Sequence, residues 1–315
     1  MSAHESMIAQ AVERMLADAA PGDGFDPGLW AALADSGVPR LLRPEDQGGA
    51  GEAWRDAAAV LQAAGARAAA APIADTLIAH ALLAGAGIDA DDGPVRLLVA
   101  GPDGRPDPMR DAAPADAHRL VVDPWGEAAR CGWRPSGGGE ARAFVVADAA
   151  GVRARLALAS ASMLTGAMRT AIAMAVEYAG LRRAFGRPIG QFQAVQHPLA
   201  VAAEEVAASR AALDWAAAEL EAGGGTVAAA VAKARSADAA GRVAAVVHQV
   251  HGAIGFTAEH ALHRSSRVLW RWRERWGDEH DWNAVLGGLA LSGGPDALFD
   301  LLDGRTDRAG LPPTT

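Results

Sequence analysis

The spacing of apolar residues along the chain changes twice, and each change predicts a different kind of structure. Before residue 93 the apolar positions recur every three or four residues, as in Ile8, Val12 and Met15, which is the period of an amphipathic helix. Glycine and proline interrupt this pattern at residues 21–24 and 37–51, which predicts loops there. We therefore expect short helices over residues 8–19 and 29–33 and longer ones over residues 52–70 and 73–84.

The middle of the chain, residues 93–155, lacks this helical period. Short apolar runs at residues 96–100, 118–122 and 142–148 are separated by clusters of glycine, proline and aspartate. Such runs between turn-forming residues are typical of strands. This stretch predicts a small β segment.

Helical spacing returns from Leu156 onward. Apolar residues repeat every seven positions at Leu199, Val206, Leu213 and Leu220, a seam that suits nearly parallel packing of helices. Further helices are expected over residues 226–250, 258–276 and 282–302, with a turn at 251–255. The predicted fold class is therefore mainly α with a small β segment. Its expected parts are an N-terminal helical domain (1–92), a short middle β segment (93–155), a C-terminal bundle of the four-helix type (156–304) and a tail (305–315).

Composition restricts the function classes. Half of the 315 residues are hydrophobic, so the chain can bury a large core, and 38 acidic residues against 29 basic ones give a net charge of −9. This acidity argues against a general binder of nucleic acid or anionic membranes. The single cysteine, Cys131, excludes an internal disulfide, and no apolar run is long enough to cross a bilayer. We expect a cytoplasmic protein without a membrane span.

The segment RRAFGRPIGQFQAVQH, residues 182–197, interrupts the helical pattern with chemically specific residues. Its glycines and proline predict a structured connection between two helices. Arg182 offers a forked set of N–H donors, Phe185 an aromatic ring and Gln193 an amide. This combination suits a phosphate group and a nucleotide base.

This segment resembles the R-x-x-F-G-x-P-I-x-x-F-Q-x-x-x-H segment of the acyl-CoA dehydrogenase family. Residues 249–256, QVHGAIGF, are similar to the Q-x-H-G-G-x-G-F/Y segment of that family, and residues 29–51 resemble its N-terminal helical entry. In the family both C-terminal segments reach across a dimer interface to the FAD of the neighbouring subunit. The resemblance implies that Arg182 binds the FAD pyrophosphate, that Phe185 packs beside the adenosine, and that Gln193 and Gln249 supply amide contacts. Gly252 and Ala253 would line the cofactor, with Ala253 at the position of the second family glycine.

The chain departs from the family pattern where the reaction takes place. Family members remove the α-proton of an acyl-CoA with a glutamate that directly precedes a glycine, and here Trp276 stands at that position before Gly277. A minority of members place the base at the start of the first C-terminal helix, but no acidic residue stands near Leu156. The middle β segment is also about half the usual length and lacks the T-E-P-x-A-G-S-type segment that holds the flavin ring. The sequence therefore predicts no catalytic residue in this chain.

Some alternatives stay open at this point. Glu274, Asp278 or Glu279 could replace the missing base if the chain bends at Gly277, although charged residues at helix ends are usually solvated. His248 with His251, and His260 with His263, have the i,i+3 spacing of metal ligands. Both pairs fall in or beside residues 249–256, and the resemblance of that segment to the family explains the histidines without a metal.

The arginine and tryptophan run at residues 264–276 could be a nucleic-acid or membrane surface, but it is more simply a helix with a packed face and a basic face. Glu259 is interpreted as structural.

The resemblance leads to one main functional hypothesis. The chain is expected to be the non-catalytic subunit of a hetero-oligomeric acyl-CoA dehydrogenase, in which it completes the FAD site of a catalytic partner chain. The α2β2 dehydrogenases of steroid side-chain CoA esters, which have one degenerate subunit, resemble this arrangement. The expected role is therefore in fatty acid or steroid side-chain catabolism. The alternatives are a homomeric, flavin-free pseudoenzyme or scaffold and, ranked last, an active homomer with a relocated carboxylate.

Overall fold

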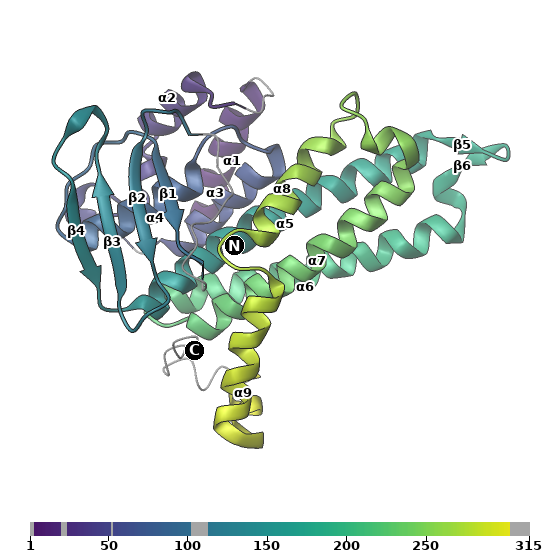
Figure 1. Cartoon of the computed structure of the whole chain (residues 1–315). Helices are drawn as coiled ribbons and strands as arrows, with labels where there is room; N and C mark the ends of the chain where they lie inside the picture. The colour runs from purple at the N-terminus through teal and green to yellow at the C-terminus, as the bar shows by residue number, and fades with distance from the viewer. Residues whose placement is uncertain (1–2, 20–23, 52, 102–112, 303–315) are drawn as a thin grey trace.

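The computed structural model describes residues 3–19, 24–51, 53–101 and 113–302 (Figure 1). It is mainly helical with one small sheet, which confirms the predicted fold class. Four helices lie before the sheet: α1 (Ala3–Asp18), α2 (Pro27–Asp35), α3 (Trp54–Arg67) and α4 (Ile73–Gly85). Asp26 begins α2 by accepting a hydrogen bond from the Leu29 amide, and Gly87 takes a left-handed conformation (φ 67°) just past the end of α4.

The sheet contains β1 (Val95–Val99), β2 (His118–Asp123), β3 (Ala129–Arg134) and β4 (Arg142–Val146) in sequential order. β1 and β2 are parallel, and the later neighbours are antiparallel. Residues alternate between the two faces, so that Val95, Leu97 and Val99 of β1 are buried. Strand β3 was not predicted from the sequence, because its buried residues Ala129, Cys131 and Trp133 alternate with arginine and glycine instead of forming an apolar run.

The first helix of the C-terminal bundle, α5 (Ala149–Leu181), is the centre of the fold. Every residue from Leu156 to Met168 is buried, and α5 packs against α3, α6, α7 and α8. The helix begins at Ala149, because the Asp148 carboxylate caps the Gly151 amide at 2.8 Å. The expected boundary at Leu156 was therefore placed too late. It falls inside α5, and the expected strand over 142–148 ends at Val146.

Close approach between α3 and α5 depends on two glycines. A Cβ atom on Gly65 would overlap the Met163 carbonyl, and one on Gly166 would overlap the Gln62 carbonyl. The two backbones therefore touch, which couples the N-terminal helices to the bundle.

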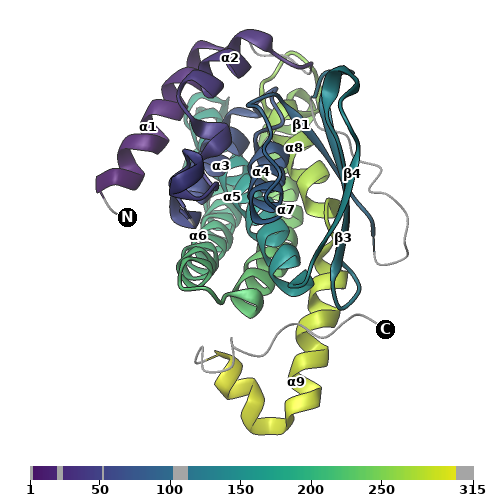
Figure 2. The same ribbon diagram turned by 90° about the vertical axis from the view of Figure 1, so that its left-hand side faces the viewer.

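The remaining helices are α6 (Gln193–Glu221), α7 (Thr226–His251), α8 (Leu262–Glu274) and α9 (Glu279–Leu302). Leu213 and Leu220 of the predicted seam are buried in α6, and Leu199 and Val206 pack at the edge of the core. The expected helix over 258–276 is shorter at both ends, so Trp276 lies beyond it. Figure 2 shows the sheet on one side of the bundle and α9 extending away from both. The expected tail, residues 305–315, lies outside the described residues.

Candidate functional site

The two segments that resemble the FAD-binding segments of the family, residues 182–197 and 249–256, are called the first and second flavin-type segments. The first one begins with a hairpin at the end of the bundle far from the sheet (Figure 1). Two short strands, β5 (Arg183–Ala184) and β6 (Arg187–Pro188), are joined by Phe185 and Gly186, both with positive φ (50° and 82°). Two left-handed residues in succession are typical of a tight hairpin turn. The turn leaves Phe185 96% exposed. Its ring stands edge-on to the Phe192 ring, with 6.2 Å between the ring centroids.

The second flavin-type segment begins where α7 ends at His251. Gly252 has φ 64° and ψ −143°, a conformation that favours glycine, and the short helix η5 (Gly252–Phe256) follows. A Cβ atom built on Gly252 would meet nothing within 4 Å. Ala253 is exposed beside it. The backbone at this turn is therefore open to a close-approaching molecule.

An aromatic contact brings the two segments together. The Tyr178 ring on α5 stacks on the His251 ring with 4.8 Å between centroids, and the Tyr178 carbonyl accepts a hydrogen bond from the Arg182 amide at 2.8 Å. Arg182 and Gly252, which are far apart in the sequence, thus stand on either side of one stacked pair. The structure places both segments at the same end of the bundle.

Three polar side chains predicted for this site have no hydrogen-bond or ion-pair partner within the described parts of the chain. They belong to Arg182, Gln193 and Gln249, and all three residues are exposed. Fork-shaped guanidinium donors and side-chain amides in this state can bind a phosphate or a nucleotide without first breaking internal bonds.

The position expected for the catalytic carboxylate is filled by a buried indole. Trp276 is 4% exposed, and its ring packs edge-on against Trp272 at 5.2 Å. The chain leaves α8 at Glu274 and turns sharply, because Trp276 and Gly277 both have positive φ (59° and 93°). The Trp276 carbonyl accepts a hydrogen bond from the Trp282 indole at 3.1 Å, which fixes this turn.

A buried ion pair stands beside Trp276. Arg275 donates to the Asp75 carboxylate on α4 at 2.7 Å, and the two side chains are 1% and 0% exposed. The Arg275 guanidinium also lies 4.7 Å and 4.5 Å from the Trp272 and Trp276 ring centroids. Asp75 further accepts the Leu97 amide of β1 at 3.1 Å. This pair connects the N-terminal helices, the sheet and the turn that carries Trp276.

The three carboxylates near Trp276 do not stand in its place. Asp278 caps α9 by accepting the His280 and Asp281 amides, and Glu274 is exposed at the end of α8. Glu279 pairs with Arg273, and hydrogen bonding from Arg273 lowers the pKa of Glu279. The second family position, Leu156, is buried inside α5 without an acidic neighbour in the sequence. The contacts of these residues therefore favour none of them as a replacement for the missing catalytic carboxylate.

Lys233, on α7, was missed because a lysine inside an alanine-rich helix gives no signal of burial. Its ammonium group is fully buried and donates to the Ser160 hydroxyl at 2.8 Å and to the carbonyls of Trp272 and Arg273 at 2.7 and 3.0 Å. A cation at the C-terminal end of a helix is favourable for the helix dipole. Lys233 holds the end of α8 directly before Trp276.

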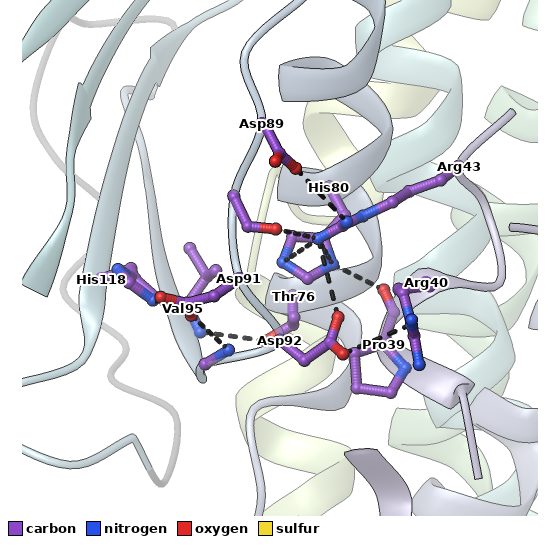
Figure 3. Close-up of polar contacts among 12 residues, drawn as sticks. Pro39, Arg40, Arg43, Thr76, His80, Asp89, Asp91, Asp92, Val95 and His118 are labelled. Carbon is purple, nitrogen blue, oxygen red and sulfur yellow. Dashed lines mark hydrogen bonds and ion pairs between the residues drawn. The ribbon is translucent and has the colours of Figure 1, made fainter. Parts of the chain in front are cut away.

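A second polar cluster, in the N-terminal domain, is also invisible in the sequence (Figure 3). Arg43 donates to the Ala90 carbonyl at 2.6 Å and approaches His80, which contacts the Pro39 carbonyl at 2.7 Å. Burial, together with the charge of Arg43, lowers the pKa of His80 to about 4. Arg43, His80 and Ala90 border a hollow that is too narrow to hold a ligand. Their mutual bonds hold the loop between α4 and β1.

The histidine pairs have other partners than a metal. His248 contacts the Ser266 hydroxyl at 2.8 Å and stacks on Phe256, while His251 donates to the Val247 carbonyl at 2.7 Å. Among the residues that the structure describes, no group of three or more histidine, cysteine or acidic side chains is arranged to hold a metal ion.

One helix in the described chain, α5, is long and apolar enough to cross a membrane. However, 78% of its most apolar stretch is buried inside the fold. Its hydrophobicity is accounted for by its place at the centre of the bundle.

Comparisons with known proteins agree with this architecture. Residues 148–270 match the family model described as acyl-CoA dehydrogenase, C-terminal domain. Acyl-CoA dehydrogenase IpdE2 of Mycobacterium tuberculosis is 31% identical over 263 residues, which cover 76% of this chain and 79% of that protein. IpdE2 of Mycolicibacterium smegmatis is 28% identical over 80% of this chain and 86% of that protein. A chain of the ChsE4-ChsE5 complex from Mycobacterium tuberculosis has the same fold, with a TM-score of 0.75 at 21% identity, covering 94% of this chain and 99% of that one.

The structural match covers both the N-terminal helices and the C-terminal bundle. The two flavin-type segments lie at the same end of that bundle. The chain belongs to the acyl-CoA dehydrogenase family.

Proposed function

We propose that this chain is the non-catalytic subunit of a hetero-oligomeric, FAD-dependent acyl-CoA dehydrogenase and completes the FAD site of a catalytic partner chain. One observation carries this proposal. The flavin-type end of the bundle is exposed, and Arg182, Gln193 and Gln249 have no side-chain partner among the described residues, whereas the position of the catalytic base is filled by buried Trp276. Such a chain can contribute to a cofactor site without carrying out the reaction.

The exposed end of the bundle fits one part of FAD. Arg182 would bind the pyrophosphate with two parallel N–H groups, Phe185 would pack beside the adenosine, and Gln193 and Gln249 would supply amide contacts. The open space at Gly252 supports this fit, because a cofactor can approach the backbone there. The methyl group of Ala253 stands next to that space. FAD, when bound, supplies the hydride acceptor of the dehydrogenation.

The environment of Trp276 argues against catalysis by this chain alone. An indole cannot accept the α-proton of an acyl-CoA, and a positioned base is worth about 10²- to 10⁴-fold in rate. The neighbouring charge is the cation of Arg275, which is committed to Asp75. We therefore expect negligible acyl-CoA dehydrogenation by the isolated protein.

The relatives support a partner and indicate a substrate class. The fold is shared with a chain of the ChsE4-ChsE5 complex and, at a TM-score of 0.73 and 22% identity, with a chain of the Tcur3481-Tcur3483 steroid acyl-CoA dehydrogenase. By analogy, the substrates of the proposed complex are CoA thioesters of steroid side chains or fatty acids. We place the complex in the cytoplasm.

The test is to purify the chain alone and co-expressed with each full-length acyl-CoA dehydrogenase encoded near it. Flavin absorbance and turnover with an acyl-CoA and an electron acceptor are recorded each time. The proposal predicts a flavin-loaded, active complex and an inactive isolated chain. Turnover by the isolated chain would support a relocated base, and a flavin-free homomer that binds no such partner would support a scaffold.

A further inference from the structure

The contact between the Tyr178 and His251 rings joins the two halves of the proposed FAD site, which are Arg182 and the turn at Gly252. Tyr178 is on α5, four residues before Arg182, and His251 is the last residue of α7, directly before Gly252. Their rings are nearly parallel, with an interplanar angle of 26°. We infer that this stack is a positioning contact that sets Arg182 relative to the Gly252 turn. The inference rests on the proposed FAD-completing function.

The Arg182 backbone is fixed relative to Tyr178. Arg182 donates its amide to the Tyr178 carbonyl at 2.8 Å, and its own carbonyl accepts the Ile189 amide at 2.8 Å. Arg182 is thus held between the last turn of α5 and the short helix η4 (Ile189–Gln191) that follows the hairpin. A displacement of Tyr178 therefore displaces the base of the Arg182 side chain.

His251 is fixed relative to Gly252 on the other side of the stack. Its Nδ1 donates to the Val247 carbonyl at 2.7 Å, so the imidazole cannot rotate without losing a buried hydrogen bond. The turn folds tightly onto His251, because a Cβ atom on Gly255 would lie only 2.9 Å from the His251 Cβ. His251 therefore moves together with the turn that starts at Gly252.

A third ring completes the cluster. His260, which follows η5, stands edge-on to Tyr178 at 6.3 Å and to His251 at 4.6 Å. Its Nδ1 accepts the Leu262 amide at 3.1 Å, which ties it to the start of α8. The rings come from α5, α7 and the connection to α8, so the cluster ties the ends of these elements to one another.

The role of the stack can be tested because the ring and the hydroxyl group of Tyr178 can be removed by separate substitutions. Tyr178→Leu keeps an apolar side chain but removes the ring, and Tyr178→Phe keeps the ring and removes only the hydroxyl group. An aromatic pair is worth about 0.5–1.5 kcal/mol beyond burial, which corresponds to about 2- to 12-fold in affinity. We expect Tyr178→Leu to weaken FAD binding by that factor in the complex with the catalytic subunit, and Tyr178→Phe to bind FAD as the wild type does.

The experiment titrates FAD into the apo forms of the complexes that contain wild type, Tyr178→Leu, Tyr178→Phe and Arg182→Ala. Turnover as a function of FAD concentration and the melting temperature of each apo complex are also measured. At saturating FAD the Tyr178→Leu complex is expected to recover wild-type turnover, because a positioning residue affects cofactor affinity and not the reaction.

Two outcomes would overturn this inference and leave the proposed function standing. The first is wild-type FAD affinity in Tyr178→Leu while Arg182→Ala binds weakly. The second is an equal loss in Tyr178→Phe and Tyr178→Leu, which would assign the effect to the hydroxyl group. Unchanged affinity in Arg182→Ala as well would instead refute the FAD-completing function itself.

Discussion

Replacing Asp75 by asparagine should strongly destabilise this protein, because Asp75 forms an ion pair with Arg275 and both side chains are almost completely buried. The two charged groups are 2.7 Å apart and almost completely buried, and the amide of asparagine keeps an oxygen that can accept the Leu97 amide. The substitution therefore removes charge but little shape. Removal of one partner from a buried ion pair costs about 3–5 kcal/mol, since the remaining charge stays desolvated.

Urea denaturation of the purified chain measures this cost through the midpoint at constant m-value. A matched control is Asp123→Asn, which breaks an Asp123–Arg130 pair of similar length (2.9 Å) whose side chains are 36% and 77% exposed. That change should cost less than about 1 kcal/mol.

The double variant Asp75→Asn/Arg275→Met, compared with the single variants Asp75→Asn and Arg275→Met, supplies the thermodynamic cycle. Because it removes both charges, it should be markedly more stable than the sum of the two single changes. A loss below about 1 kcal/mol in Asp75→Asn, or strict additivity in the cycle, would refute the buried-pair argument.

Two other buried groups give independent predictions. The pKa of His80 is lowered to about 4 by burial and by Arg43, so the unfolded chain binds a proton that the folded chain does not, and stability should fall as pH drops from 6.5 towards 4. The shift amounts to about 3 kcal/mol, and His80→Gln should flatten this part of the pH profile of unfolding free energy; an unchanged slope would contradict the assignment. Lys233→Met should lower the unfolding free energy by about 1–3 kcal/mol, because the carbonyls of Trp272 and Arg273 lose a buried charged donor, although the Ser160 hydroxyl still donates to Trp272. Its control is Arg210→Met on the surface of α6, and equal midpoints for both variants would show that the Lys233 bonds contribute no stability.

The sequence was informative where structure follows from local period. The long helices and three of the four strands of the larger sheet were predicted because apolar spacing differs between helix and strand. The third strand, β3, was not predicted, because Ala129, Cys131 and Trp133 alternate with outward residues and form no continuous apolar run. The start of α5 was misplaced because Asp148, taken as the end of a strand, is the helix cap.

The contacts that fix the site could not be predicted, because they join residues distant in sequence. Asp75 and Arg275 are 200 positions apart, and nothing in either neighbourhood indicates a buried charge. Lys233 likewise lies in an ordinary helical pattern. The flavin-type segments were found because their residue types are specific, but the stack that joins them, Tyr178 on His251, depends on the meeting of two helix ends.

The central claim is that this chain lends its exposed bundle end to the FAD of another subunit. The most direct test is FAD titration of the co-purified complex with Arg182→Ala or Gln249→Ala, with Arg210→Ala as a surface-arginine control. Removing a hydrogen-bond partner of a charged group costs about 1.5–3 kcal/mol, or about 10- to 150-fold in affinity. We predict a loss of this size for Arg182→Ala, a loss in the same direction for Gln249→Ala, and none for the control. Unchanged FAD affinity in both site variants would contradict the account.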